Sequence, residues 1–146
     1  MRSKPFGLSL IAVLALAALG VPRAIAHDLG LVGPAVNAVL VFLPIAVWLI
    51  VVLWKRVPNP FLTLLAIGVA YGVLLGVTHQ VLWSASFGDD PPTLGGNLEG
   101  ALSPGTETML LRTFAFGSSV MTGAGVGAAV GVVGWVGSRL LRAARR

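Results

Sequence analysis

Two stretches of the chain decide its fold: residues 68–76, GVAYGVLLG, and residues 123–131, GAGVGAAVG. Each has a glycine at every fourth position, at Gly68, Gly72 and Gly76 in one and at Gly123, Gly127 and Gly131 in the other. In an α-helix such residues lie nearly above one another and leave a smooth groove along one face. A second helix can approach that groove closely, and in lipid such dispersion packing replaces hydrophobic collapse. The pattern predicts an all-α integral membrane protein packed through glycine-zipper faces.

The composition agrees with a membrane protein of one domain. Hydrophobic residues make up 56% of the 146 residues and charged residues only 10%, which is unusual for a soluble chain. Cysteine is absent, so disulfides, thiolate catalysis and sulfur-ligated metals are excluded. The net charge of +5 does not indicate nucleic-acid binding, because most basic residues flank apolar segments without polar or aromatic residues that could read bases. These flanking residues are Arg2, Lys4, Lys55, Arg56, Arg139, Arg142, Arg145 and Arg146.

Apolar stretches predict three or four transmembrane helices. They cover residues 6–26, 35–54, 61–83 and 113–137. The last three have close to the ~20 residues that cross a bilayer. Pro34 suits the start of a helix, whereas Pro44 predicts a kink because it removes a backbone donor and crowds the preceding turn. The link over residues 55–60 is short enough to impose an antiparallel hairpin.

The basic clusters predict one orientation, because lysine and arginine favour the cytoplasmic side. The link at Lys55 and Arg56 and the tail over residues 138–146 then lie inside a bacterial-type plasma membrane, and the loop over residues 84–108 lies outside. All acidic residues fall outside: Asp28, Asp89, Asp90, Glu99 and Glu107. We interpret the loop as a solvated connector, although a loop of this length is also where an external partner would bind. Thr106 or Thr108 is expected to cap the fourth helix.

The first segment resembles a secretory signal in every part. Arg2 and Lys4 form a basic n-region, residues 8–19 form an apolar h-region, and residues 24–26 read Ala-Ile-Ala, a small-residue cleavage motif. We expect residues 1–26 to be a cleaved signal peptide, which leaves a membrane domain over residues 27–146 with three helices. The alternative is a retained first transmembrane helix with the same orientation.

Three polar residues near the outer side form a candidate polar or ion site: His79, Gln80 and Arg112. Polar groups inside a span cost free energy unless they face protein or water. Gln80 continues the Gly68, Gly72, Gly76 row by four residues, so it should lie on the packed face. A proton- or ion-handling role is the functional interpretation, whereas an interhelical hydrogen bond explains the same residues without one. Arg112 is expected to reach the headgroups or to pair with Glu107 or a loop aspartate.

Cleavage after Ala26 would make His27 the first residue of the mature chain. Its α-amine and imidazole could then bind one Cu(II) ion, which favours nitrogen ligands, with His79 as a further ligand. Apart from this metal hypothesis, no cofactor is expected. Ser118, Ser119 and Thr122 are interpreted as interhelical contacts, because no base stands at a spacing that would activate a hydroxyl.

The sequence therefore predicts a multi-pass membrane protein without catalysis. We expect an accessory or assembly component whose helices pack in the bilayer against a second copy or a larger membrane complex. The alternative is an oligomeric pore or minimal transporter, since glycine-rich helices can line pores between subunits. An enzyme is least favoured, because no paired acids, Ser/base pair or metal cluster is found.

Overall fold

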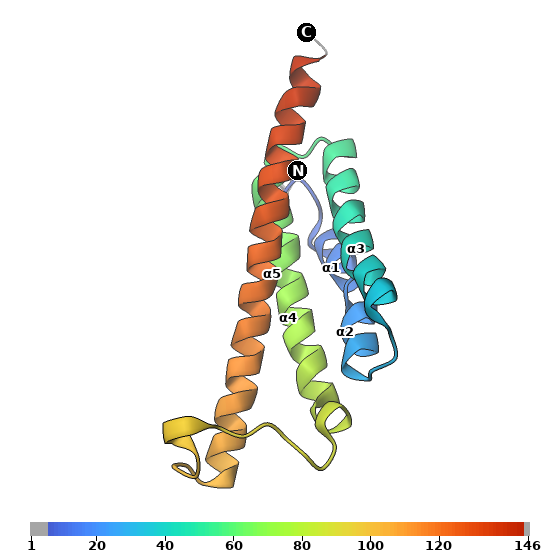
Figure 1. Cartoon of the computed structure of the whole chain (residues 1–146). Coiled ribbons are helices and arrows are strands. Elements are labelled where there is room, and N and C mark those ends of the chain that lie inside the picture. Colours follow the sequence, from blue (N-terminus) through green and yellow to red (C-terminus); the bar gives the residue numbers. More distant parts are fainter. Residues whose placement is uncertain (1–5, 145–146) are drawn as a thin grey trace.

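The computed structural model describes residues 6–144, and these form helices without any strand. Four helical stretches are long and apolar enough to cross a membrane: Leu10–Asp28, Pro34–Trp54, Pro60–Phe87 and Pro104–Ala143. The first is divided into α1 (Leu10–Ala18) and α2 (Val21–Asp28), and the others are α3 (Pro34–Trp54), α4 (Pro60–Phe87) and α5 (Pro104–Ala143). A short 3-10 helix, η1 (Gly96–Leu98), lies in the loop before α5. Figure 1 shows an up-and-down arrangement in which α4 and α5 run side by side.

The contact between α4 and α5 is the most extensive in the molecule. All six glycines of the two rows are buried in this interface. A Cβ atom added to Gly68 would lie 2.5 Å from the Cα of Gly127, and one added to Gly72 would lie 2.8 Å from the Ser119 carbonyl oxygen. Real Cβ atoms essentially never come within 3.0 Å of such neighbours. The two backbones therefore touch at a separation that only glycine permits.

The N-terminal segment packs against α4 as two short helices. Ser9 begins α1, with its hydroxyl accepting from the Ala12 backbone at 3.2 Å. The helix stops before Gly20, where the ring of Tyr71 leaves no space for a side chain, and α2 restarts with Pro22 in its first turn. Proline suits that position because its missing N–H has no helical partner there. The segment is thus helical but divided into two short helices just before Pro22.

The apolar core lies between α1, α3 and α4 near the short α3–α4 link. It consists of Leu8, Val13, Ala17, Trp48, Val52, Val57, Leu64 and Ile67. Trp48 is 1% exposed, and its indole Nε1 donates to the Leu16 carbonyl at 2.7 Å. Burying an indole with its N–H satisfied fixes the first segment onto α3. Pro44 lies inside α3, as the sequence indicated.

Two helices extend beyond their expected bounds. Helix α4 continues to Phe87, and α5 begins at Pro104 instead of residue 113 and continues to Ala143. The connector is correspondingly reduced to residues 88–103, and most of the expected tail over residues 138–146 belongs to α5. Ser103, not Thr106 or Thr108, is the N-cap residue of α5. Proline at the first helical position explains this early start, because its fixed φ already suits a helix.

Charge separates between the two ends of the bundle, which we name the hairpin end (residues 55–59 and 138–144) and the loop end (residues 88–103 with the helix termini beside it). Lys55, Arg56, Arg139 and Arg142 lie at the hairpin end. The loop and the start of α5 carry Asp89, Asp90, Glu99 and Glu107 at the opposite end (Figure 1). Arg2, Lys4, Arg145 and Arg146 fall outside the described residues. The helical arrangement thus gives the molecule a basic end and an acidic end.

Candidate functional site

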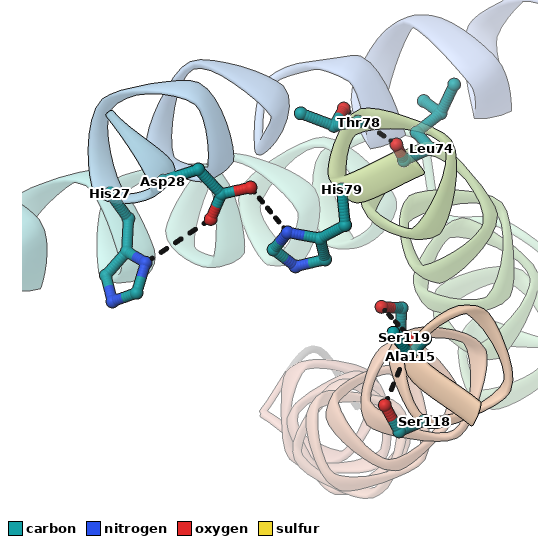
Figure 2. Close-up of polar contacts among 8 residues, drawn as sticks. All are labelled: His27, Asp28, Leu74, Thr78, His79, Ala115, Ser118 and Ser119. Atoms are coloured by element: carbon teal, nitrogen blue, oxygen red, sulfur yellow. Dashed lines mark hydrogen bonds and ion pairs between the residues drawn. The ribbon is translucent and has the colours of Figure 1, made fainter. Parts of the chain in front are cut away.

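Asp28 joins two histidines at the loop end of the bundle. It is the last residue of α2, and its side chain is only 8% exposed. His79 on α4 donates from Nδ1 to Asp28 Oδ2 at 2.5 Å, while His27 Nδ1 lies 3.4 Å from Oδ1 of the same carboxylate. Figure 2 shows the carboxylate between the two imidazole rings. A nearly buried acid is thus bonded to an imidazole from a distant helix. The three side chains form the main cluster of ionisable groups in residues 6–144.

The predicted site of His79, Gln80 and Arg112 divides between two faces of α4. His79 faces α2, whereas Gln80 donates from Nε2 to the Arg112 carbonyl of α5 at 3.0 Å. The Arg112 guanidinium lies over the Trp83 ring, 5.0 Å from its centroid. No ion pair between Arg112 and Glu107 forms in the described residues; the Glu107 carboxylate instead accepts from the Leu94 backbone at 2.5 Å. Consecutive helical residues point about 100° apart, so one residue serves each neighbouring helix.

A groove of about 490 Å³ lies beside Gln80 and Arg112, with Met109 and Phe116 among its lining residues. It is shallow and wide, and its polar groups are already engaged in the contacts just described. Such a surface offers little enclosure to a small ligand, which normally buries most of its area.

A second polar contact tethers α2 to α3. Arg23 donates from Nε to the Asn37 side-chain oxygen at 3.1 Å. Arg23 also lines a small cavity of about 170 Å³ with Tyr71, Trp48 and Pro44. The guanidinium is therefore held within the bundle instead of extending into the loop region.

The helical hydroxyls are engaged with their own backbone. Ser118 and Ser119 both donate to the Ala115 carbonyl, at 3.0 and 2.8 Å, and Thr78 donates to the Leu74 carbonyl at 2.8 Å (Figure 2). Such back-bonding satisfies a hydroxyl without a partner helix. None of these three hydroxyls bonds to an imidazole or a carboxylate in the described residues, so none has the geometry of an activated nucleophile.

The histidines that the metal hypothesis combined do meet, but they meet at Asp28. Within residues 6–144 no group of three or more histidines and acids is arranged to hold a metal ion. In both imidazole rings, Nδ1 faces the carboxylate of Asp28. The arrangement fits a hydrogen-bonded carboxylate better than a coordination sphere.

Three contacts of the bundle escaped sequence reasoning because each joins residues far apart in the chain. Asp28 reads as an ordinary surface acid, Trp48 as one of many apolar residues, and Thr63 as a helical hydroxyl. Thr63 is in fact fully buried, and its hydroxyl lies 2.6 Å from the Phe6 carbonyl and 2.8 Å from the Asn59 carbonyl. Only an expectation that the first segment stays in the bundle could have suggested these partners.

Comparisons with known protein families, with curated proteins and with solved structures found no match to this chain.

Proposed function

We propose that this chain is a non-enzymatic multi-pass protein of a bacterial-type plasma membrane, which acts by packing its helices against another membrane protein chain. The apolar exterior supports placement in a bilayer. Large apolar side chains remain exposed along the spans, among them Ile11 at 79% and Phe114 at 74%. A soluble monomer rarely leaves so large an apolar surface in water, whereas lipid solvates it without cost.

The charge distribution supports the proposed orientation. The hairpin end, with its lysine and arginines, lies in the cytoplasm, and the acidic loop over residues 88–103 lies outside. Arg23 and Arg112 are the described basic residues away from the hairpin end. Each has a local contact, Asn37 for Arg23 and the Trp83 ring for Arg112, but both remain charged. The orientation is supported by the larger number of basic residues at the hairpin end: Lys55, Arg56, Arg139 and Arg142.

The glycines of α5 divide into an inner and an outer set. Gly123, Gly127 and Gly131 form, with the row on α4, the glycine zipper that we propose holds α4 to α5 in lipid. Gly117 and Gly125 point elsewhere, and a Cβ atom on either would meet nothing within 4 Å. This open face, with exposed Met121 between the two glycines, carries the proposal: it allows a helix from a second copy or a larger complex to approach closely.

Single cysteines test this surface cleanly, because the chain has none of its own. Gly117→Cys and Gly125→Cys, each labelled with a benzophenone maleimide, should form photo-crosslinks in native membranes, because the activated ketone inserts into C–H bonds of an adjacent helix and needs no amine there. Ile50→Cys on α3, whose side chain is 64% exposed, is the matched control for random collisions in the bilayer. Products of twice the chain mass would identify a second copy, and heavier products a different subunit.

Gly125→Leu completes the test by blocking the open face. It should abolish the crosslinks from Gly117→Cys while the purified chain keeps its helix content and melting temperature. If crosslinks from both glycine positions never exceed those from Ile50→Cys, the open face of α5 has no partner and the proposed function fails.

The Asp28–His79 pair favours one alternative, a minimal transporter or pore that passes protons or cations. Its carboxylate ends a candidate span and is nearly buried, and intramembrane acids often mark ion pathways. This function predicts ion flux into liposomes from the purified chain that is lost in Asp28→Asn. The packing function predicts no such flux.

A further inference from the structure

A basic hollow lies at the hairpin end, where the α3–α4 link meets the last turns of α5. Its volume is about 310 Å³, and its lining includes Arg56 from the link and Arg142 from α5. A smaller hollow of about 140 Å³ adjoins it and is lined by Arg139. The two share Pro58, Pro60, Ser138 and Arg142. Three guanidinium-bearing side chains from two distant parts of the sequence thus surround one continuous depression.

These arginines have no acidic counterpart. Among residues 6–144 the ion pairs all involve Asp28, near the opposite end of the bundle, and the remaining acids belong to the loop or to the start of α5. Arg139 lies over the Trp135 ring at 4.9 Å from its centroid, a contact that orients the guanidinium without neutralising it. The depression therefore concentrates uncompensated positive charge.

The backbone at Arg56 is held in an unusual conformation. Its φ is +48°, and it is the only residue other than glycine with positive φ in the described part of the chain. Residues with a Cβ atom avoid positive φ. A residue held in this conformation within a packed structure therefore indicates that the fold requires its backbone to turn there. Here Val57 is fully buried beside Arg56, and the turn places Arg56 on the rim of the hollow while Val57 anchors the link.

Most of the other residues that line the larger hollow are apolar. Val52 and Leu53 come from the last turn of α3 and Leu141 from α5. Val52 and Leu53, in α3, precede Arg56 and so lie on the membrane side of it, whereas Leu141 lies between Arg139 and Arg142 at the level of these arginines. A ligand that fits this surface has an anionic head and an apolar tail.

We propose that the hollow binds the phosphate headgroup of an anionic phospholipid, with an acyl chain lying against Leu53. Arginine suits phosphate because its planar donors can engage two oxygens at once. Basic pockets between transmembrane helices on the cytoplasmic side are suited to such headgroups. The inference rests on the proposed membrane placement, in which the hairpin end faces the cytoplasmic leaflet. A free phosphate ion shares the charge chemistry but does not use the apolar wall.

The test is native mass spectrometry of the purified full-length chain in detergent, titrated with dioleoylphosphatidylglycerol. One lipid should bind more tightly than the others that follow. Each of Arg56→Gln and Arg142→Gln should weaken that first binding about fivefold, and the double variant about 25-fold. Arg112→Gln is the matched control, since it removes the same charge from an arginine at the opposite end of the bundle, and it should leave the first binding unchanged.

Two further ligands separate the sources of phosphate. Dioleoylphosphatidylcholine, which has the same chains and no net charge, should bind at least tenfold more weakly. Inorganic phosphate should not displace the lipid, and displacement at equal concentration would overturn the lipid assignment in favour of a free anion. Equal weakening by Arg112→Gln, or equal binding of the two lipids, would overturn the site itself.

Failure of the membrane placement is visible separately. A single cysteine in place of Glu99 should react with a membrane-impermeant maleimide in intact cells, whereas one in place of Asn59 should not. If this labelling pattern reverses, the orientation fails whatever the lipid titration gives. If labelling holds and the lipids do not discriminate, only the lipid site fails.

Discussion

His79 illustrates how one side chain acquires a role from its partner. The sequence predicts a polar residue near the outer end of a span, and an interhelical hydrogen bond was one explanation for it. The structure supplies the partner, Asp28, from a segment 51 residues away. Because the carboxylate is nearly buried, removal of the His79 imidazole leaves Oδ2 of the acid without its partner in a poorly solvated position.

A double-mutant cycle on His79→Ala and Asp28→Ala measures this contact. We expect each single variant to be destabilised and a coupling free energy of about 1 kcal/mol, within the range found for polar contacts between membrane helices. The cycle can be recorded by thermal unfolding of the purified protein in detergent.

His27→Ala is the matched control, since His27 is 56% exposed and lies farther from the same carboxylate. Its coupling to Asp28→Ala should be close to zero, as for exposed ion pairs generally. A cycle with His27 that equals the cycle with His79 would mean that the two rings are interchangeable, contrary to the geometry.

At the scale of the helices, glycine spacing is the most informative signal in the sequence. The fourfold spacing on two segments indicates which faces approach closely, and it can be recognised without any tertiary information. The helix ends are harder to predict. Hydropathy detects the apolar centre of α5 but not its polar beginning, where Pro104 and Ser103 set the start, or its arginine-rich end.

The candidate site was predictable only in part. His79, Gln80 and Arg112 draw attention as polar residues in apolar surroundings. His79 contacts α2 and Gln80 contacts α5 because of how α4 is rotated relative to its neighbours. The spacing of residues in the sequence does not by itself give that rotation. Asp28 escapes notice because nothing in the chain around it indicates burial.

The two glycine sets of α5 predict opposite outcomes for one added methyl group. On Gly127 the new Cβ atom would lie 2.9 Å from the Gly68 Cα and 2.8 Å from the Leu64 carbonyl oxygen. Gly127→Ala should therefore force α4 and α5 apart and lower the free energy of unfolding by about 2 kcal/mol. Gly125→Ala meets open space and should change it by less than about 0.5 kcal/mol.

Thermal unfolding in detergent, followed by circular dichroism, compares the two glycine variants directly. Equal melting temperatures would show that α4 and α5 do not depend on the close contact at Gly127. A loss of stability in Gly125→Ala that matches the loss in Gly127→Ala would place that glycine in a packed interface as well.

For the molecule as a whole, the first segment makes contacts that a chain cleaved after Ala26 would lack. Ala24 of the Ala-Ile-Ala motif is fully buried within α2. The same segment provides the partners of the Trp48 indole and the Asn37 amide. Removal of residues 1–26 would leave these groups, and the core around Val13 and Ala17, without their contacts.

We therefore expect the protein purified from its native membrane to keep residues 10–28, as determined by intact mass and N-terminal sequencing. A chain beginning at His27 would contradict this expectation. In such a chain the free α-amine of the first residue would lie near both histidines. A copper titration would then become the next measurement.

The close α4–α5 contact also bears on how the protein is made. In the proposed membrane placement α4 leaves the ribosome before α5, so the glycine face of α4 enters the bilayer before its partner exists. Until α5 is complete, that face is open to lipid or to any other helix nearby. Chains interrupted before residue 104 would thus expose a ready-made surface for wrong associations, and membrane quality-control proteases would have a clear means of recognising them.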